Sequence, residues 1–460
     1  MRLSLGECKK ICDAMGEGDE RVITGVVTDS RNCQAGNLFA CIQGEKVDGH
    51  DYALQAQEKG ASAIIAEKEI TGLSIPVLQV PNTIVALDRL AKKWREQYAG
   101  PVIAITGTAG KTTLKDTLAN ILSQKGSVQA TKLNYNNQLG VALTILEATG
   151  KEDYWVIEAG ISHAHDMDEL GEILKPDLAI ILNAGAGHIA GLGERGVAWH
   201  KARLCNWLSD KGLAIVNADY PELLKETLKY RKKIYPFSLK LEKEYPCNLL
   251  SESAEGEYKA RLNGKECVFR TPYDGSWGAE ITLAAALAAN ILGLSDEIAN
   301  KGFAVSSMPC GRMNFGKIGG FEIYDGSYNA NPLSMRRMLE SAAGKAGKEK
   351  KPWLAVLGEM GELGEIASSC HRELGKLLAA LKPALIIWNG NYENEIKNGL
   401  KDSGAGEIPL FTVKSSGEFS TLVKKLWEQK LLPPEALILF KGSRANRLEN
   451  HIAEFKNIFQ

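Results

Sequence analysis

The chain has 460 residues, of which 44% are hydrophobic and 24% charged, and its formal net charge is -1. At roughly 150 residues per domain, this length predicts about three globular domains. The balanced charge and the short basic clusters do not form the extended basic surface typical of nucleic-acid binding, so we expect no nucleic-acid partner.

Cysteine spacing and apolar segments indicate the compartment. The 9 cysteines are scattered, with no Cys-x-x-Cys pair and no metal-binding spacing, which predicts free thiols in a reducing environment. Residues 1–20 lack the apolar core of a signal peptide, and no apolar run reaches the about 20 residues that span a bilayer. We therefore expect a cytoplasmic protein with no membrane association.

Residues 1–98 are predicted to form a small α/β domain. Strand-like runs occur at Val22–Val27 and Ala61–Ala66, and Thr83–Tyr98 has helical periodicity. The sequence Ala99-Gly100-Pro101 breaks this pattern and predicts a linker to the next domain.

Residues 99–310 alternate strand and helix patterns. The expected strands are Val102–Thr106, Tyr154–Glu158, Leu178–Leu182 and Ala214–Asn217, and the expected helices are Lys111–Gln124 and the Ala-rich Ile281–Leu292. Such β-α units predict a doubly wound parallel sheet with right-handed crossovers.

Residues 311–460 repeat this logic and predict a Rossmann-like α/β domain. The expected strands are Phe321–Tyr324, Trp353–Leu357, Ala384–Trp388 and Leu437–Phe440, with a helix at Cys370–Ala380. A substrate site between such domains predicts closure by hinge motion. The glycines at Ala99-Gly100 and Cys310-Gly311 mark the two expected hinges.

A glycine-rich turn after the strand Val102–Thr106 predicts a phosphate-binding loop. Its residues are Gly107, Thr108, Ala109, Gly110, Lys111, Thr112 and Thr113. Glycines let backbone amides approach phosphate oxygens, and the helix N-terminus favours negative charge. Lys111 is expected to reach the β- and γ-phosphates of ATP, and Thr112 to ligate Mg²⁺. The spacing Gly-x-x-Gly-Lys-Thr is shorter than the usual form, because Ile105 stands where the first glycine would be.

Polar residues follow two further predicted strands. Because parallel strands end at one edge of a sheet, Glu158 is expected to complete a Mg²⁺ site with Thr112, unless it is a helix cap or a solvated acid. His188 follows the strand Leu178–Leu182, although a lone histidine is more often structural. Lys201 is expected at the start of a helix and indicates nothing by itself.

Together these motifs resemble the Mur ligase family over nearly the whole chain. Asp29-Ser30-Arg31 is similar to its uridine-nucleotide module, and Asn134–Gly140 to its asparagine-rich substrate loop. The string Tyr328-Asn329-Ala330-Asn331-Pro332 is similar to a signature of the members that join UDP-N-acetylmuramoyl-tripeptide to D-alanyl-D-alanine. The resemblance implies an ATP-dependent, monomeric amide ligase of peptidoglycan precursor synthesis that works through an acyl phosphate.

The resemblance also implies roles for single residues. Ser30 and Arg31 would bind the uridine nucleotide, and Glu158 and His188 would ligate Mg²⁺. Arg312 and Asp325 would contact ATP, and Lys201 would be carbamoylated. The substrate-binding residues would be Asn134, Asn136, Asn137, Asn329 and Asn331.

Three positions depart from the family's pattern. Arg203 replaces an acid, Gly326 replaces one of two paired acids, and Trp277–Ile281 replaces an asparagine-containing segment near the adenine. A buried core position is the favoured interpretation of Trp277, with stacking on the base as the alternative. These departures leave two alternatives open, a related ligase for another amino acid or dipeptide and a non-catalytic binder of the cell-wall precursor.

Overall fold

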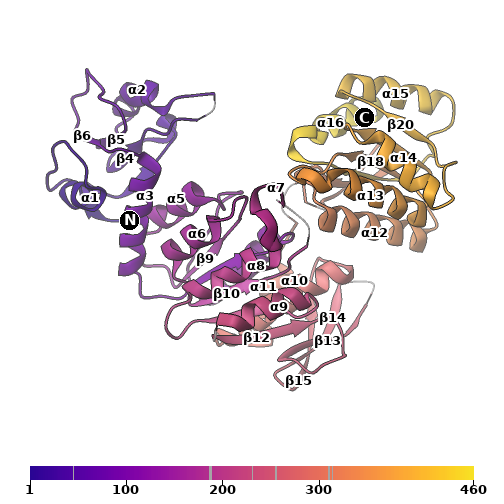
Figure 1. Ribbon diagram of the computed structural model, residues 1–460, viewed down its shortest axis with the longest axis horizontal. Helices are drawn as coiled ribbons and strands as arrows, with labels where there is room; N and C mark the ends of the chain where they lie inside the picture. The colour runs from indigo at the N-terminus through magenta and orange to yellow at the C-terminus, as the bar shows by residue number, and fades with distance from the viewer. Residues whose placement is uncertain (45, 186–188, 231, 254–255, 309–310, 313) are drawn as a thin grey trace.

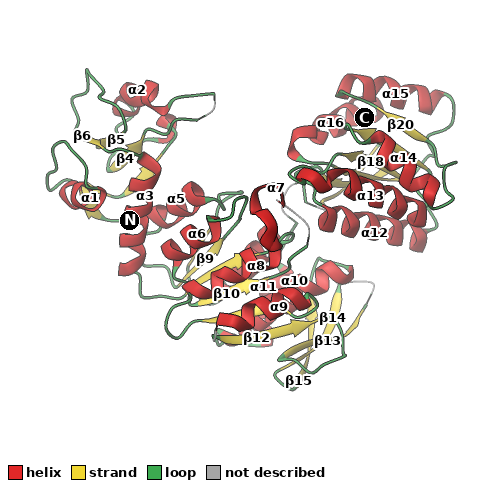
Figure 2. Cartoon of the chain, viewed as in Figure 1, coloured by secondary structure: helices red, strands yellow, loops and turns green. Residues whose placement is uncertain are grey.

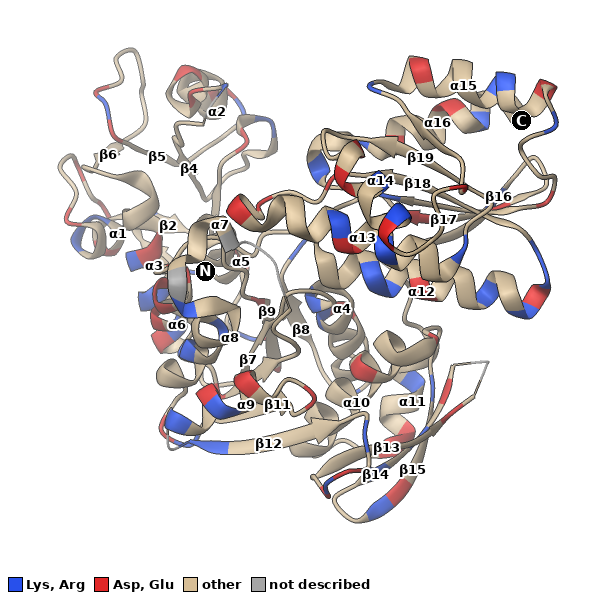
Figure 3. Cartoon of the chain, turned by 45° about the vertical axis from the view of Figure 1, so that its right-hand side comes forward, with Lys and Arg blue, Asp and Glu red and all other residues tan. Residues whose placement is uncertain are grey.

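The computed structural model describes residues 1–460 except 45, 186–188, 231, 254–255, 309–310 and 313. Its three α/β domains follow the order of the chain, and the N- and C-terminal domains lie on opposite sides of the central domain (Figure 1). The predicted fold class is therefore confirmed. Acidic and basic residues are interspersed along the exposed helices (Figure 3), and the formal net charge is -1.

The N-terminal domain has a parallel sheet in the order β3-β4-β5-β6. The bounds are β3 Gly25–Val27, β4 Asn37–Ala40, β5 Ala63–Ala66 and β6 Val77–Gln79, with helices α1 Leu5–Cys12, α2 Ala53–Glu58 and α3 Thr83–Gln97. The predicted strand Val22–Val27 is divided at Thr24, whose N–H donates to the carbonyl of Gly36. Its first half, β2 (Val22–Ile23), pairs instead with β1 (Leu3–Ser4) in a small antiparallel sheet.

The central sheet has the order β15-β14-β13-β12-β11-β10-β7-β9-β8. Its strands are β7 Val102–Thr106, β8 Val128–Ala130, β9 Tyr154–Glu158, β10 Leu178–Ile181, β11 Leu213–Asn217, β12 Lys233–Ser238, β13 Cys247–Glu252, β14 Glu257–Leu262 and β15 Lys265–Arg270. The strands from β8 to β13 are parallel, as predicted. β14 runs antiparallel to both of its neighbours and extends the sheet beyond the predicted strands.

Helices cover both faces of the central sheet (Figure 2). They are α4 Lys111–Leu122, α5 Gln138–Glu147, α6 Asp166–Leu174, α7 Ile189–Leu192, α8 Gly196–Ala202, α9 Pro221–Thr227, α10 Gly275–Ile291 and α11 Asp296–Ala304. Successive residues of a strand point to opposite faces. Accordingly, Ile103 and Ile105 of β7 join a core with α4, whereas Val102 and Ala104 join a core with α5. The fully buried centre of this sheet gives the phosphate loop a rigid base.

The C-terminal domain has the sheet order β16-β17-β21-β18-β19-β20, with β16 antiparallel and the other strands parallel. The strands are β16 Asn314–Ile318, β17 Phe321–Gly326, β18 Trp353–Gly358, β19 Leu385–Asn389, β20 Leu410–Thr412 and β21 Leu437–Lys441. The helices are α12 Pro332–Glu349, α13 Ala367–Leu381, α14 Glu393–Asp402, α15 Ser416–Glu428 and α16 Leu448–Phe459. Within the part of the chain that the structure describes, no helix is both long and apolar enough to cross a membrane.

Candidate functional site

The glycine-rich loop lies at the carboxyl end of β7, between β9 on one side and β10 on the other. Gly110, the residue before α4, has a φ of +85°, a conformation that favours glycine. A Cβ on Gly107 would lie 3.1 Å from the Cβ of Leu182, so this position also has little room for a side chain. The loop therefore turns tightly into the first turn of α4, and the shortened spacing of its glycines fits that turn.

Asn183, which follows β10, holds the loop through its carboxamide. Its Oδ1 accepts from the backbone N–H groups of Thr108 at 2.8 Å and Ala109 at 3.0 Å. Its Nδ2 donates to the carbonyl of Ala109 at 2.9 Å. One side chain thus fixes two successive peptide groups of the loop. Sequence analysis did not assign Asn183, although its position directly after a buried strand was the available signal.

Thr112 and Glu158 meet beside this loop. The hydroxyl of Thr112 donates to Glu158 Oε2 at 2.7 Å, and Glu158 Oε1 accepts from Asn136 Nδ2 at 2.7 Å. Thr112 and Glu158 are buried. Hydroxyl and carboxylate oxygens are ligands that Mg²⁺ prefers when phosphate oxygens complete its shell. His188, the third predicted metal ligand, lies outside the described residues, so its role stays a prediction.

Two lysines, the half-buried Lys111 and the buried Lys201, lie near Glu158. Lys111 Nζ donates to the carbonyl of Gly107 at 2.8 Å, and burial and the charge of Arg312 lower its pKa. Lys201 is 2% exposed, and burial together with the charge of Lys111 holds its pKa well below the usual value. Lys201 lies in the last turn of α8, so the expectation that it begins a helix was wrong. That helix starts at Gly196, and Lys201 near its end lies close enough to Lys111 and Glu158 to feel both charges.

The C-terminal domain supplies the other wall of the site. Asn331 caps α12 by accepting from the N–H of Ser334 at 2.9 Å, and its Nδ2 donates to the carbonyl of Thr108 at 3.3 Å. The Arg312 guanidinium lies 4.3 Å from the ring centre of Tyr328. Lys441, at the end of β21, donates to the carbonyl of Asn329 at 2.8 Å. Burial, and next the charge of Arg312, lowers the pKa of Lys441 to about 7.

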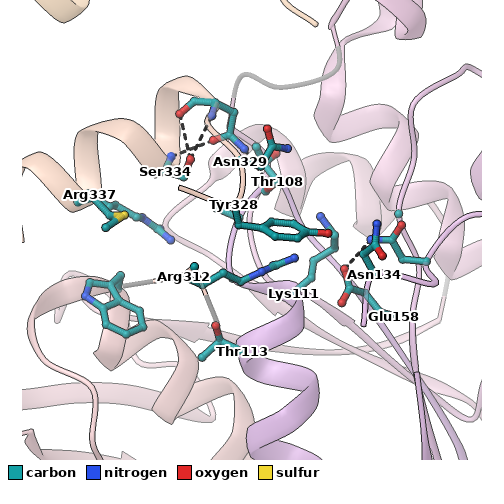
Figure 4. Close-up of a pocket in the computed structure, with 18 of the residues that line it drawn as sticks. Thr108, Lys111, Thr113, Asn134, Glu158, Arg312, Tyr328, Asn329, Ser334 and Arg337 are labelled. Carbon is teal, nitrogen blue, oxygen red and sulfur yellow. Dashed lines mark hydrogen bonds between the residues drawn. The ribbon is translucent and has the colours of Figure 1, made fainter. Parts of the chain in front are cut away.

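These two walls enclose one pocket. Figure 4 shows Lys111, Asn134 and Glu158 on one side of it, Arg337 on the other, and Arg312 and Tyr328 between them. The predicted residues that line it are Thr108, Ala109, Gly110, Lys111, Thr113, Asn134, Asn136, Asn137, Glu158, Arg312, Asn329 and Asn331. Trp277 is 8% exposed, as expected for a core residue, and it lines the pocket together with Ile281 and Met308.

Some predicted residues lie apart from this pocket lining. Ser30 donates to Gln55 Oε1 at 2.5 Å and Arg31 pairs with Asp29 at 2.7 Å, both within the N-terminal domain. Asp325 Oδ1 accepts from the Ser327 N–H at 3.0 Å and from its hydroxyl at 2.6 Å. Roles for Ser30, Arg31 and Asp325 stay predictions.

A buried acid that sequence analysis did not assign connects the two walls. Glu280 of α10 is 1% exposed and pairs with Arg337 of α12 through two hydrogen bonds of 2.8 and 3.0 Å. Arg337 also donates to the hydroxyl of Tyr220 at 3.1 Å. The signal in the sequence was a single carboxylate within an otherwise apolar, Ala-rich helix, because such a charge needs a buried partner.

A phosphate loop at the centre of a doubly wound sheet, facing a second α/β domain across a pocket, defines a class of nucleotide-binding α/β proteins. Family models narrow this class. The Mur ligase family catalytic domain matches residues 22–95, the Mur ligase middle domain residues 105–289, and the Mur ligase glutamate ligase domain residues 311–444. The chain belongs to the Mur ligase family.

The similarity to known proteins covers nearly the whole chain. UDP-N-acetylmuramoyl-tripeptide–D-alanyl-D-alanine ligase of Bacillus subtilis is 31% identical over 95% of this chain and 94% of that protein. The ligase of the same name from Escherichia coli is 29% identical over 97% of both chains. A crystal structure of MurF from Acinetobacter baumannii is similar with a TM-score of 0.87, 28% identity and coverage of 99% of both chains. Thermotoga maritima MurF in complex with ADP has a TM-score of 0.80 and 26% identity over 95% of this chain and 98% of that chain.

Proposed function

We propose that this chain is an ATP-dependent ligase that joins UDP-N-acetylmuramoyl-tripeptide to D-alanyl-D-alanine in peptidoglycan precursor synthesis. The observation that carries the proposal is the pocket in which Lys111 and Glu158, the acceptor of the Thr112 hydroxyl, face Asn329 and Asn331 of the C-terminal domain. The relatives that share this whole chain bear the name of that ligase.

The reaction requires activation of a carboxylate. A carboxylate oxygen of the tripeptide attacks the γ-phosphorus of ATP, the bond to the β,γ-bridging oxygen breaks, and ADP leaves with that electron pair. The dipeptide amine then attacks the acyl carbon, phosphate leaves, and the amine loses a proton. Carboxylate and γ-phosphate repel each other, so the ammonium of Lys111 is placed to offset that repulsion and the charge on the transferring group.

Thr112 and Glu158 are the residues that would hold Mg²⁺. Both present oxygen atoms, both are buried, and they lie next to the loop where the β- and γ-phosphates would lie. When bound, the metal ion neutralises phosphate charge during transfer. In the nucleotide complex, Lys111 would exchange the carbonyl of Gly107 for phosphate oxygens, since a charged acceptor binds an ammonium more strongly than a peptide carbonyl does.

Carbamoylation of Lys201 is part of this proposal. The amine must be neutral to attack CO₂, forming a carbamate and releasing a proton. Burial, and next the charge of Lys111, lowers the pKa of Lys201, which favours the neutral amine that this reaction needs. A crystal structure of the ligase with a nucleotide tests it, and a free amine at Lys201 away from any metal ion would contradict it.

The remaining assignments belong to the same proposal. Asn134, Asn137 and Asn329 line the pocket and would contact the peptide substrates, together with Asn136 and Asn331. Ser30 and Arg31 would bind the uridine nucleotide, and Asp325 the ATP ribose. We further propose a cytoplasmic monomer with domains at 1–98, 99–310 and 311–460.

Phosphate release measured with ATP, UDP-N-acetylmuramoyl-tripeptide and several dipeptides tests the proposed activity. We expect the fastest release with D-alanyl-D-alanine. Faster turnover with another amino acid or dipeptide would identify a related ligase. No turnover together with retained precursor binding would identify a non-catalytic binder.

The Lys111→Ala variant tests the role of the loop. We expect phosphate release to fall by about 100-fold or more, the loss typical when a charge-stabilising donor is removed. Lys125→Ala, at an exposed lysine just beyond α4, is the matched control and should retain activity. Undiminished coupling of the two peptides in Lys111→Ala would refute the proposed function.

A further inference from the structure

Glu280 is a fully buried carboxylate whose two oxygens each accept from two donors. Oε2 accepts from Asn183 Nδ2 at 3.0 Å and from Arg337 Nη1 at 2.8 Å. Oε1 accepts from Asn217 Nδ2 at 2.7 Å and from Arg337 Nη2 at 3.0 Å. Asn217 ends β11 and Asn183 follows β10, so the two carboxamides lie at neighbouring strand ends. The acid therefore connects the sheet edge with the C-terminal domain.

The hydrogen bond from Asn183 to Glu280 affects how Asn183 contacts the phosphate loop. A carboxamide has one end that donates and one that accepts. Because Glu280 has no proton to donate when ionised, it can receive only the NH₂ end of Asn183. The oxygen end is thereby turned toward the loop, where it accepts from the N–H groups of Thr108 and Ala109. Glu280 thus selects the rotamer of Asn183 that shapes the loop.

Arg337 makes this arrangement depend on the C-terminal domain. Its guanidinium extends from α12 toward the pocket (Figure 4) and pairs with Glu280, which lies on α10 of the central domain. A buried carboxylate without a counter-charge is strongly unfavourable, and removing one partner of a buried pair leaves that cost uncompensated. The ionised form of Glu280 is therefore best stabilised when the C-terminal domain is docked.

We propose that Glu280 is a positioning residue for the phosphate loop, acting through Asn183, and that Arg337 couples this positioning to docking of the C-terminal domain. The inference rests on the proposed function for the identity of the ligand, a nucleoside di- or triphosphate. It adds Glu280, which acts on the loop through Asn183, and Arg337, which pairs with this acid from the other wall of the pocket. The proposal also implies that nucleotide affinity depends on both the central domain and the docked C-terminal domain.

Calorimetric titration of ADP into the full-length protein tests the proposal. In Glu280→Gln one terminal atom becomes an NH₂ group, so the carboxamide of Asn183 or of Asn217 faces another donor. We expect ADP affinity to fall by about tenfold in Glu280→Gln and in Arg337→Met, within the range of coupling between linked sites. The matched control is Arg336→Met, because Arg336 is exposed on the same helix and pairs with Glu340 at 3.5 Å. It should bind ADP as the unmodified chain does.

A mutant cycle with Asn183→Ala separates positioning from simple stabilisation. If Glu280 acts through Asn183, Glu280→Gln causes no further loss of ADP affinity in the Asn183→Ala background. An equal tenfold loss in both backgrounds would overturn the proposal, as would unchanged ADP affinity in Arg337→Met. In steady-state assays the KM for ATP should rise more than kcat falls. Failure of the unmodified chain to bind ADP would instead contradict the proposed function.

Discussion

The N-terminal and C-terminal domains are joined to the central domain by junctions of different chemistry. At the first junction, α3 packs against α5, and Leu87 and Leu90 share a core with Val141 and Ile145. The indole of Trp94 adds a hydrogen bond of 3.0 Å to the carbonyl of Ala148. Separating these helices would expose apolar surface to water, at a free-energy cost of about 25 cal/mol per Å². This junction therefore favours one arrangement.

At the second junction, polar groups cross between the domains beside apolar contacts, because one buried cluster includes Ile281 of α10 and Met338 of α12. Arg337 reaches Glu280, and Asn331 reaches the carbonyl of Thr108. Charged and amide groups can exchange these hydrogen-bond partners for water or for a ligand. Apolar side chains gain no comparable contact when water replaces their neighbours. The two glycine-containing hinges predicted from the sequence therefore differ in expected mobility. We expect closure to occur mainly at the second junction, although Cys310 of that hinge lies outside the described residues.

Removing Trp94 should cause the largest effect and test the apolar junction. We expect Trp94→Ala to lower the free energy of unfolding by about 3–5 kcal/mol, the usual cost of deleting a buried aromatic ring. Denaturant titration followed by fluorescence measures it. Trp427→Ala is the control, because Trp427 is 44% exposed on the C-terminal domain and should cost less. A loss below about 1 kcal/mol for Trp94→Ala would contradict a fixed first junction.

A buried acid at the first junction predicts a smaller, pH-dependent effect. Asp88 of α3 accepts from Gln138 of α5, and its Oδ1 is buried with no hydrogen-bond partner among the described atoms. Burial raises the pKa of Asp88 to about 7. Between about pH 4 and this value, the unfolded chain releases the proton that the folded chain keeps, so stability falls as pH rises. Above it, the full cost of the buried charge remains.

Asp88→Asn should therefore stabilise the protein by about 1–3 kcal/mol at pH 8. The gain should shrink as the pH is lowered toward about 4, because Asp88 is then protonated in the folded state and regains protons in the unfolded state. Denaturant titrations at both pH values measure the difference. An equal gain at both would show that Asp88 is not ionised within this junction. Asp51→Asn, at an exposed aspartate, is the control and should change little.

Asn331→Asp tests the second junction with the smallest change in structure. Aspartate keeps the oxygen that caps α12 but cannot donate to the carbonyl of Thr108. It also places a negative charge where phosphates would bind. We expect a melting temperature within a few degrees of the original and about a tenfold loss of ADP affinity. Unchanged ADP affinity would show that this contact between the domains does not contribute to the nucleotide site.

Continuous apolar runs made much of the fold predictable. The bounds of β7 and β9 agree with the sequence analysis, because each strand is an uninterrupted buried run beside a turn or a polar residue. By contrast, α10 begins at Gly275, six residues before the predicted start at Ile281. Its first turns contain two glycines and a buried acid, so tertiary packing rather than helix propensity determines where it begins.

The site was predictable where its residues are neighbours in sequence. Lys111 and Thr112 lie within one motif, and that motif alone indicates phosphate binding. Asn183 and Glu280 are 97 residues apart, and Glu280 and Arg337 are 57 apart. Their contacts depend on strand order and domain docking, which hydrophobic periodicity does not encode. Such long-range polar pairs became visible only in three dimensions.

The short phosphate loop has a consequence for how tightly the molecule grips a triphosphate. Asn183 already occupies the N–H groups of Thr108 and Ala109, so fewer backbone donors face the ligand than the loop contains. Cationic side chains have to supply the difference, and Arg312 approaches from across the pocket. A nucleotide held from both walls acts as a bridge between the domains. A ligand that binds one domain arrangement more tightly raises the population of that arrangement as the ligand concentration rises. The supply of nucleotide thereby sets the fraction of molecules in which the two walls are together.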